Sequence, residues 1–228
     1  WHQSGGQEGV QRSLRLQQPL HLPLRGAQLE GHPFSSILIM PVPHHLIIGG
    51  QRSGKSRHAE RLAMRWLAQS PDHAVTVLAT ATASDEEMRQ RIERHRAERP
   101  VVFETLEAPV HLGQALRGLC DARRMVIVDC LTLWLANVLM PPVPQTPEAL
   151  ASNWADLKAN LLSALRSTAS PVLLVSNEIG CGVIPMGADV RHFVDELGRL
   201  HQDVAQACAQ ISLMAAGQAF TRDVEVWT

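Results

Sequence analysis

Short apolar segments rich in Val, Ile and Leu alternate along most of the chain with longer amphipathic segments. Residues 75–80 read VTVLAT and residues 172–176 read VLLVS, and such near-continuous apolar runs are typical of parallel strands buried on both faces. Elsewhere, apolar positions such as Phe193, Leu197 and Leu200 recur at helical spacing. The alternation predicts an α/β fold, with a mostly parallel sheet and helices on both faces. The predicted strands are residues 46–48, 75–80, 125–129, 172–176, 211–215 and 223–227, and the predicted helices are residues 57–69, 84–99, 109–119, 131–139, 148–167 and 189–210.

Residues 49–56 read GGQRSGKS, a complete G-x-x-x-x-G-K-[ST] phosphate loop between a predicted strand and a predicted helix. Its glycines let the backbone curl so that successive N–H groups converge on phosphates at the positive end of the helix. Lys55 supplies a charge for the terminal phosphates, and the Ser56 hydroxyl can reach Mg²⁺. The alternative interpretation is a Gly-rich turn that carries a surface lysine, but such a turn would not require a strand before it and a helix after it. The motif predicts a P-loop NTPase fold that binds a nucleoside triphosphate through Gly49, Gly50, Gln51, Arg52, Ser53, Gly54, Lys55 and Ser56.

The first 39 residues differ from the rest of the chain. They are rich in Gln, Gly, Ser and Arg and show no sustained hydrophobic periodicity, and the first methionine of the chain is Met40. We expect residues 1–39 to be a non-native or disordered extension, with Met40 as the natural start and residues 40–228 as the P-loop domain. His44 and His45 precede the first predicted strand, and we interpret them as a polar lead-in.

Composition limits the class of protein. The formal net charge is −1, which favours neither a nucleic-acid partner nor an acidic membrane surface. No apolar run reaches the roughly 18 residues of a membrane span. The four cysteines are scattered without metal-ligand spacing, and Cys130 and Cys208 have apolar surroundings in the sequence, which favours buried thiols in a reducing cytoplasm.

In a parallel α/β sheet, ligands bind beyond the carboxyl ends of the strands. Asp129 ends an apolar strand, which is the position of the Walker-B carboxylate that holds magnesium beside a phosphate loop. The alternative is that this aspartate caps the next helix. Residues 80–82 end another strand, where they either face a nucleotide or simply form a turn. Asn177 and Glu178 follow a third strand, where they either orient a substrate hydroxyl or form a tight turn.

The predicted helix 84–99 carries an unusual histidine. Ser84 and Glu87 form a capping box, and Met88, Ile92 and His95 follow helical spacing, so that His95 shares the buried stripe. The simplest interpretation is that His95 is a buried core residue with its hydrogen bonds made and only a structural role. However, four arginines surround it, and neighbouring positive charge favours neutral imidazole, whose ring nitrogen can attack phosphorus. Those arginines either hold a triphosphate or pair with nearby glutamates. They are Arg91, Arg94, Arg96 and Arg99.

Five separated segments are similar to one known family. They read GGQRSGKSRHAERLA, ATATASDEEMRQRIERHRAERP, VDCLTLWLANVL, SNEIGCGVIP and RHFVDELGRLHQDVA, in order between Leu46 and Gly217. Together they resemble the bifunctional adenosylcobinamide kinase/adenosylcobinamide-phosphate guanylyltransferase family of late cobalamin biosynthesis. The resemblance implies two reactions. The first phosphorylates the aminopropanol hydroxyl of adenosylcobinamide, and the second transfers GMP from GTP through a guanylylated histidine to give adenosylcobinamide-GDP and pyrophosphate.

The resemblance also implies roles for individual residues. The family pattern R-I-x-x-H-R-x-x-R-P places the nucleophile at His95, and Lys55 is the second catalytic residue. Glu107 matches a glutamate of the family, and Ser56 and Asp129 are the implied magnesium ligands. The implied nucleotide contacts are residues 49–56, Thr80, Ala81, Thr82, Arg96, Ala97, Glu98, Arg99, Glu107 and Asp129.

The implied cofactor is Mg²⁺, with GTP and ATP as substrates and adenosylcobinamide and its phosphate as partners. We expect no nucleic acid, no membrane span, a cytoplasmic location and a homo-oligomer, for which a trimer is one form. The chain departs from the family pattern at Phe103, at His201 and in its last residues. The alternative within the same class is a P-loop small-molecule kinase without guanylyltransferase activity. A nucleotide-binding switch is the alternative from another class.

Because residues 1–39 show no periodicity, deleting them is expected to leave folding and activity intact. The measurement compares the melting temperature and turnover of the full chain with those of the shortened chain. A large loss of either in the shortened chain would contradict the expectation.

Overall fold

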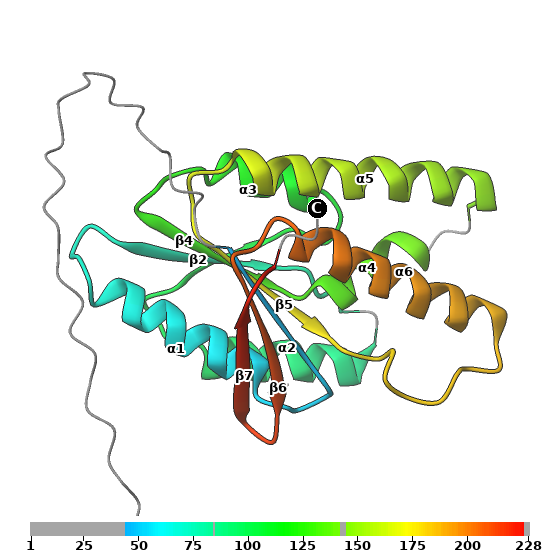
Figure 1. Ribbon diagram of the computed structural model, residues 1–228, viewed down its shortest axis with the longest axis horizontal. Helices are drawn as coiled ribbons and strands as arrows, with labels where there is room; N and C mark the ends of the chain where they lie inside the picture. The colour runs from blue at the N-terminus through cyan, green and yellow to red at the C-terminus, as the bar shows by residue number, and fades with distance from the viewer. Residues whose placement is uncertain (1–43, 84, 142–144, 226–228) are drawn as a thin grey trace, which may run out of the picture. The chain divides into compact units, whose positions relative to one another are not determined.

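The computed structural model describes residues 44–83, 85–141 and 145–225 (Figure 1). The predicted extension, residues 1–39, lies outside the described residues, as do Ser84 of the predicted capping box and the last two residues of the predicted strand 223–227. No helix within the described ranges combines the length and apolar character needed to cross a membrane.

A seven-stranded sheet forms the centre of the domain, in the order β3-β2-β4-β5-β1-β6-β7. All neighbouring strands from β3 to β6 pair in parallel, and β7 pairs antiparallel with β6. The central strands are buried because Val, Ile and Leu fill both faces. The strands are β1 (His45–Gly49), β2 (Ala74–Ala79), β3 (Glu104–Glu107), β4 (Arg124–Asp129), β5 (Val172–Asn177), β6 (Gln210–Ala215) and β7 (Gln218–Asp223).

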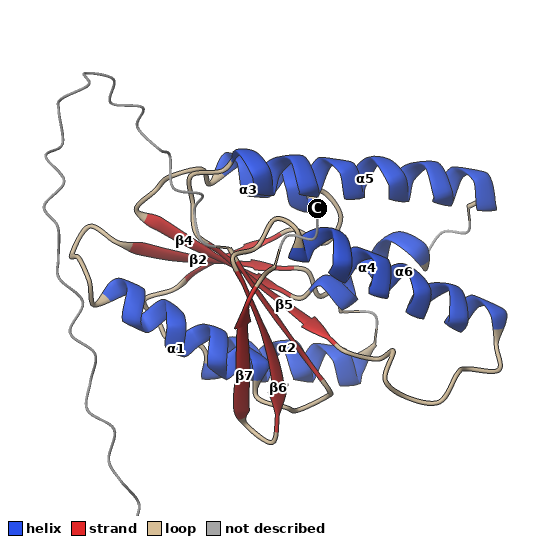
Figure 2. Cartoon of the chain, viewed as in Figure 1, coloured by secondary structure: helices blue, strands red, loops and turns tan. Residues whose placement is uncertain are grey.

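Helices cover both faces of the sheet, as predicted (Figure 2). On one side, α1 packs against the apolar cluster that contains Ile47, Ala59 and Val77. On the other side, α3, α4, α5 and α6 enclose a larger cluster around Trp134 and Leu161. The helices are α1 (Lys55–Leu67), α2 (Glu86–Glu98), α3 (Leu112–Gly118), α4 (Leu131–Leu139), α5 (Pro147–Ser167) and α6 (Ala188–Ala205).

The prediction was wrong in three places on the sheet and its helices. Strand β3 was missed because its sequence, ETLE, is exposed throughout and carries no buried apolar pattern. The last strand is β7, which lies earlier than the predicted 223–227 and forms a hairpin through Ala216 and Gly217, both with positive φ. The predicted helix 189–210 ends at Ala205, because residues 210–215 are needed as β6 beside β1.

The lead-in interpretation of His44 and His45 was also wrong, because both side chains are buried. His44 lies with Nε2 2.8 Å from the carbonyl of Leu165, and His45 with Nε2 2.8 Å from the Ser212 hydroxyl. Burial, together with the nearby His58 ring, lowers the pKa of His45 to about 4. These two histidines therefore tie the start of β1 to its neighbours as neutral rings.

The contact between α3 and α5 depends on a glycine. A Cβ at Gly113 would lie 2.7 Å from the backbone carbonyl carbon of Asn160 and 2.8 Å from the nitrogen of Leu161. These are backbone atoms, which cannot rotate away as a side chain would. Gly113 therefore sets how closely α3 approaches α5 over the larger cluster.

Gly113→Ala is expected to destabilise the domain by about 1–3 kcal/mol, because the new methyl group forces the two backbones apart. The matched control is Gly118→Ala in the same helix, where a Cβ would meet nothing within 4 Å. The control is expected to be neutral or slightly stabilising, since alanine favours the helix. Thermal or urea unfolding of both variants measures the difference, and equal stabilities would contradict this account of the packing.

Candidate active site

The phosphate loop joins β1 to α1, and its geometry requires glycine at both ends. Gly49 has φ 154° and Gly54 has φ 98°, and Gly54 is the N-cap of α1. A Cβ at Gly49 would lie 2.5 Å from the backbone oxygen of Met214 on β6. The loop therefore folds directly against the end of the neighbouring strand, with the N-terminus of α1 facing the space beyond the sheet.

Lys55 lies under this loop. Its Nζ donates to the backbone oxygens of Gly49 at 2.9 Å and Gly50 at 2.7 Å. Burial lowers the pKa of Lys55, while the neighbouring Cys130 and Asp129 act in the opposite direction. The ammonium group is thus placed among the oxygens of the loop, where a phosphate would also meet it.

A cleft of about 680 Å³ lies at the carboxyl ends of β1, β2, β4 and β5, where ligands bind in parallel α/β sheets. It is bounded by the phosphate loop, the first turns of α1, the inner face of α2 and the end of β4. The predicted site residues that line it are Gln51, Arg52, Ser53, Gly54, Lys55, Ser56, Ala81, His95, Arg96, Glu98, Arg99 and Asp129.

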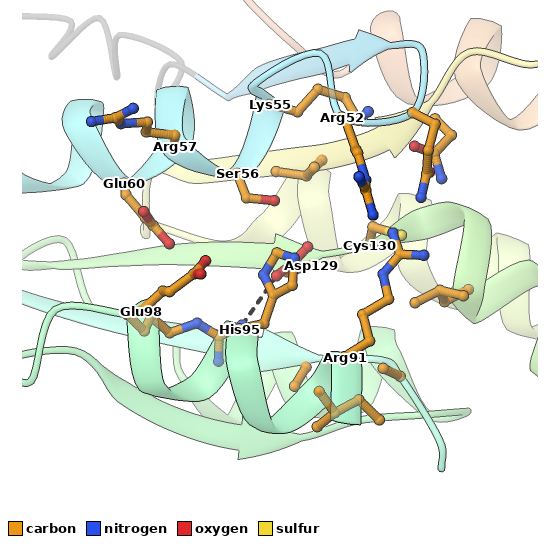
Figure 3. Close-up of a pocket in the computed structure, with 18 of the residues that line it drawn as sticks. Arg52, Lys55, Ser56, Arg57, Glu60, Arg91, His95, Glu98, Asp129 and Cys130 are labelled. Atoms are coloured by element: carbon orange, nitrogen blue, oxygen red, sulfur yellow. Dashed lines mark hydrogen bonds and ion pairs between the residues drawn. The ribbon is translucent and has the colours of Figure 1, made fainter. Parts of the chain in front are cut away.

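Helix α2 carries His95 into this cleft. The helix begins after Asp85, whose carboxylate accepts a hydrogen bond from the Met88 nitrogen at 2.7 Å, so the N-cap is Asp85 and not the predicted Ser84. Met88, Ile92 and His95 form its half-buried stripe, as their spacing predicted, but none of its residues is buried. The stripe faces the cleft and not an apolar core. Figure 3 shows His95 and Arg91 projecting from α2 toward the side of Lys55 and Ser56.

An ion pair crosses the floor of the cleft. Arg99 Nη2 donates to Asp129 Oδ2 at 3.0 Å, and the Arg99 side chain is only 9% exposed. Glu60, one turn after Ser56 on α1, also lines the cleft. Burial raises the pKa of Glu60, although Arg99 acts against this rise. Acidic and basic groups are therefore interleaved around the predicted magnesium ligands.

A smaller cleft of about 490 Å³ adjoins the first and shares Arg96 and Arg99 with it. It is also lined by Ala97 and Glu107. Arg96 forms an ion pair with Glu107, which links α2 to β3. The two clefts together bring the residues predicted on α2 and β3 next to those predicted on the phosphate loop.

The predicted residues 80–82 have different environments. Thr80 is buried, and its hydroxyl donates to the Cys130 carbonyl at 2.7 Å and accepts from the Cys130 nitrogen at 2.8 Å. Thr82 is exposed and donates to Asn137 at 3.0 Å. Only Ala81 lines the cleft. Nucleotide binding by Thr80 and Thr82 stays a prediction, and it would involve their backbone. The same holds for Gly49 and Gly50, which line neither cleft.

Asn177 lines the cleft at the end of β5, and a buried polar chain supports it from behind. The Asn177 nitrogen donates to the Thr132 hydroxyl at 2.8 Å, and Thr132 Oγ1 lies 3.1 Å from Ser176 Oγ. Ser176 Oγ lies 2.7 Å from His201 Nε2 on α6. His201 Nδ1 lies 3.8 Å from Glu178 Oε2. The chain joins α4, β5 and α6 beneath the cleft.

Sequence reasoning missed several of these groups. Glu60 carried a usable signal, because it lies four residues after Ser56 and so shares a helix face with it. His201 and Thr132 carried none, since their contacts with Ser176 join residues 25 and 44 positions apart in the chain. Cys130 lines the cleft, and burial raises the pKa of its thiol to about 11.

Comparison with known proteins gives matches over most of the domain. The family model described as cobinamide kinase / cobinamide phosphate guanyltransferase matches residues 45–221. The chain is 46% identical over 172 residues to the bifunctional adenosylcobalamin biosynthesis protein CobP of Pseudomonas aeruginosa, covering 75% of this chain and 92% of that protein. It is 33% identical over 178 residues to the bifunctional adenosylcobalamin biosynthesis protein CobU of Escherichia coli, covering 75% of this chain and 95% of that protein.

The matched region spans the sheet from β1 into β7, so it contains the phosphate loop, the helix that carries His95 and both clefts. With a phosphate loop and a histidine facing one cleft, the chain belongs to the cobinamide kinase / cobinamide phosphate guanyltransferase family.

Proposed function

We propose that this protein phosphorylates adenosylcobinamide with ATP or GTP, and then transfers GMP from GTP to adenosylcobinamide phosphate through a guanylylated His95. The observation that carries the proposal is that the phosphate loop and His95 line the same cleft. Membership of the family and the names of the bifunctional relatives support both activities. The products of the second step are adenosylcobinamide-GDP and pyrophosphate.

The kinase step depends on the phosphate loop. The N–H groups of the loop and the N-terminus of α1 bind the phosphates, and Lys55 neutralises charge that develops on the transferred phosphoryl group. Ser56 and Asp129 both line the cleft, and a hydroxyl and a carboxylate are oxygen donors that suit Mg²⁺. They are the residues that would hold the ion, which would neutralise phosphate charge.

The guanylyl step depends on His95. A ring nitrogen of His95 forms a bond to the α-phosphorus of GTP, and the bond from that phosphorus to the β-phosphate oxygen breaks. The bonding electron pair leaves with pyrophosphate. A phosphate oxygen of adenosylcobinamide phosphate then attacks the same phosphorus and releases the histidine. Arg96, Arg99 and Glu107 lie along α2 and the smaller cleft, where we place contacts to the guanine nucleotide.

We also propose that the protein acts as a homo-oligomer, for which a trimer is one form, in the cytoplasm. The support for association is the exposure of Val183 and Met186, each 96% exposed, in the segment between β5 and α6. The support for location is that all four cysteines are free thiols, which is typical of a reducing compartment.

Lys55→Ala is expected to weaken nucleotide binding by about ten- to a hundredfold, because one charged hydrogen-bond donor to the phosphates is lost, and to slow both reactions. Both activities should fall together, since one loop serves both. The measurement is nucleotide affinity with the rates of phosphorylation and of GMP transfer. Near-normal rates in Lys55→Ala would mean that the nucleotide binds elsewhere.

His95→Ala is expected to abolish covalent uptake of GMP while a measurable kinase rate remains, because the phosphoryl group passes directly from donor to substrate hydroxyl. In the wild type, labelled GTP should leave GMP on His95 as a phosphoramidate that acid hydrolyses and base does not. Mass spectrometry locates the adduct. The half-buried ring contributes little to the core, so the melting temperature should change only slightly.

Two outcomes would contradict the His95 assignment. Covalent GMP on His95→Ala would place the nucleophile at another residue. A wild type that phosphorylates adenosylcobinamide but never takes up GMP would favour the alternative, a P-loop kinase without guanylyltransferase activity.

A further inference from the structure

Arg91 connects α2 to the phosphate loop. With the Gln51 amide oriented so that its oxygen faces the guanidinium, that oxygen accepts from Arg91 Nη2 at 2.7 Å and from Nη1 at 2.9 Å. Gln51 is the third residue of the phosphate loop, and both residues line the larger cleft. The guanidinium therefore lies beside the part of the loop that would surround a nucleotide's phosphates.

Three other arginines on or beside α2 have acidic partners. Arg96 pairs with Glu107, and Arg99 pairs with Asp129. Arg89, on the same helix, pairs with Glu86. Within the described ranges, the partner recorded for Arg91 is instead a neutral amide, so no contacting carboxylate compensates its charge. The positive charge of Arg91 also acts on Lys55 in the loop, where it adds to the effect of burial in lowering the pKa of Lys55.

Arg91 and His95 lie four residues apart on α2 and so share one face of the helix. Both side chains project into the cleft in Figure 3, Arg91 toward Arg52 and Cys130. A triphosphate whose terminal phosphates lie in the loop, and whose α-phosphorus reaches His95, would pass this guanidinium. Arginine suits such a position, since its planar fork binds two phosphate oxygens at once.

We propose that Arg91 is a further catalytic residue, which binds the β- and γ-phosphates in the loop and neutralises the pyrophosphate that leaves when His95 takes GMP. The inference rests on the proposed function and adds a leaving-group contact to it. In the step, the bond between His95 nitrogen and α-phosphorus forms while the bond from α-phosphorus to the bridging oxygen breaks. The electron pair stays on pyrophosphate, where Arg91 and Lys55 balance its charge.

The test uses three variants of the full chain: Arg91→Ala, Arg91→Lys and the control Arg89→Ala. Titration calorimetry with inorganic pyrophosphate measures binding without any turnover, and labelled GTP measures the rate of GMP uptake. Arg91→Ala should bind pyrophosphate about ten- to a hundredfold more weakly and take up GMP more slowly by at least as much. Arg91→Lys should lie between, because it keeps the charge but loses the fork.

Arg89→Ala removes only an exposed pair and should stay within about fivefold of the wild type in both measurements. All three variants should melt close to the wild type, since α2 contributes no buried residue. Arg91→Ala values equal to those of Arg89→Ala would overturn the proposal. So would an equal loss of affinity for inorganic phosphate and for pyrophosphate, which would mean that Arg91 only shapes the loop through Gln51.

The two proposals can fail separately. If the wild type never takes up GMP, the proposed guanylyl step fails, while the effect of Arg91 on pyrophosphate binding is still measured. If the wild type takes up GMP on His95 and Arg91→Ala does so at the rate of the control, only the role of Arg91 is wrong.

Discussion

The close approach of backbones at Gly49 is the constraint on which this site depends. Any side chain there would meet the Met214 oxygen at 2.5 Å, so β1 and β6 can meet at the loop only through glycine. The same residue's oxygen accepts from the Glu178 nitrogen at 2.9 Å and from Lys55 Nζ at 2.9 Å. One position thus holds the end of β5, the end of β6 and the side chain of Lys55 around the start of the phosphate loop.

Helix α2 is held in a different way from the rest of the domain. It contributes no buried residue, and its links to the loop, β3 and β4 run through Arg91, Arg96 and Arg99. The Arg99–Asp129 pair is largely shielded from solvent, whereas the Arg96–Glu107 pair is exposed and would be screened by salt. The helix that carries the proposed nucleophile is therefore positioned by charge, and a bound triphosphate would act on the same groups.

Ser176, His201 and Glu178 resemble a hydrolytic triad in their order of contacts, but their burial gives them another role. Ser176 is 0% exposed, so its hydroxyl cannot reach a substrate. Burial lowers the pKa of His201, and the nearby Glu178 acts in the opposite direction. The neutral ring instead completes the hydrogen-bond chain through Thr132 that fixes the backbone of Asn177 at the cleft.

The sequence by itself determined the α/β class, most elements and the phosphate loop, because these follow from local signals: apolar runs, helical periodicity and a contiguous motif. Strand β3 and the position of β7 needed the tertiary structure, since an exposed ETLE segment becomes a strand only by pairing with β2, and β7 only by turning back on β6. The spacing of His95 placed it on the inner face of its helix, but only the fold shows that this face meets a cleft and not a core. The pairing of Arg99 with Asp129, of Arg91 with Gln51, and of His201 with Ser176 joins residues from separate elements, and no local pattern encodes such contacts.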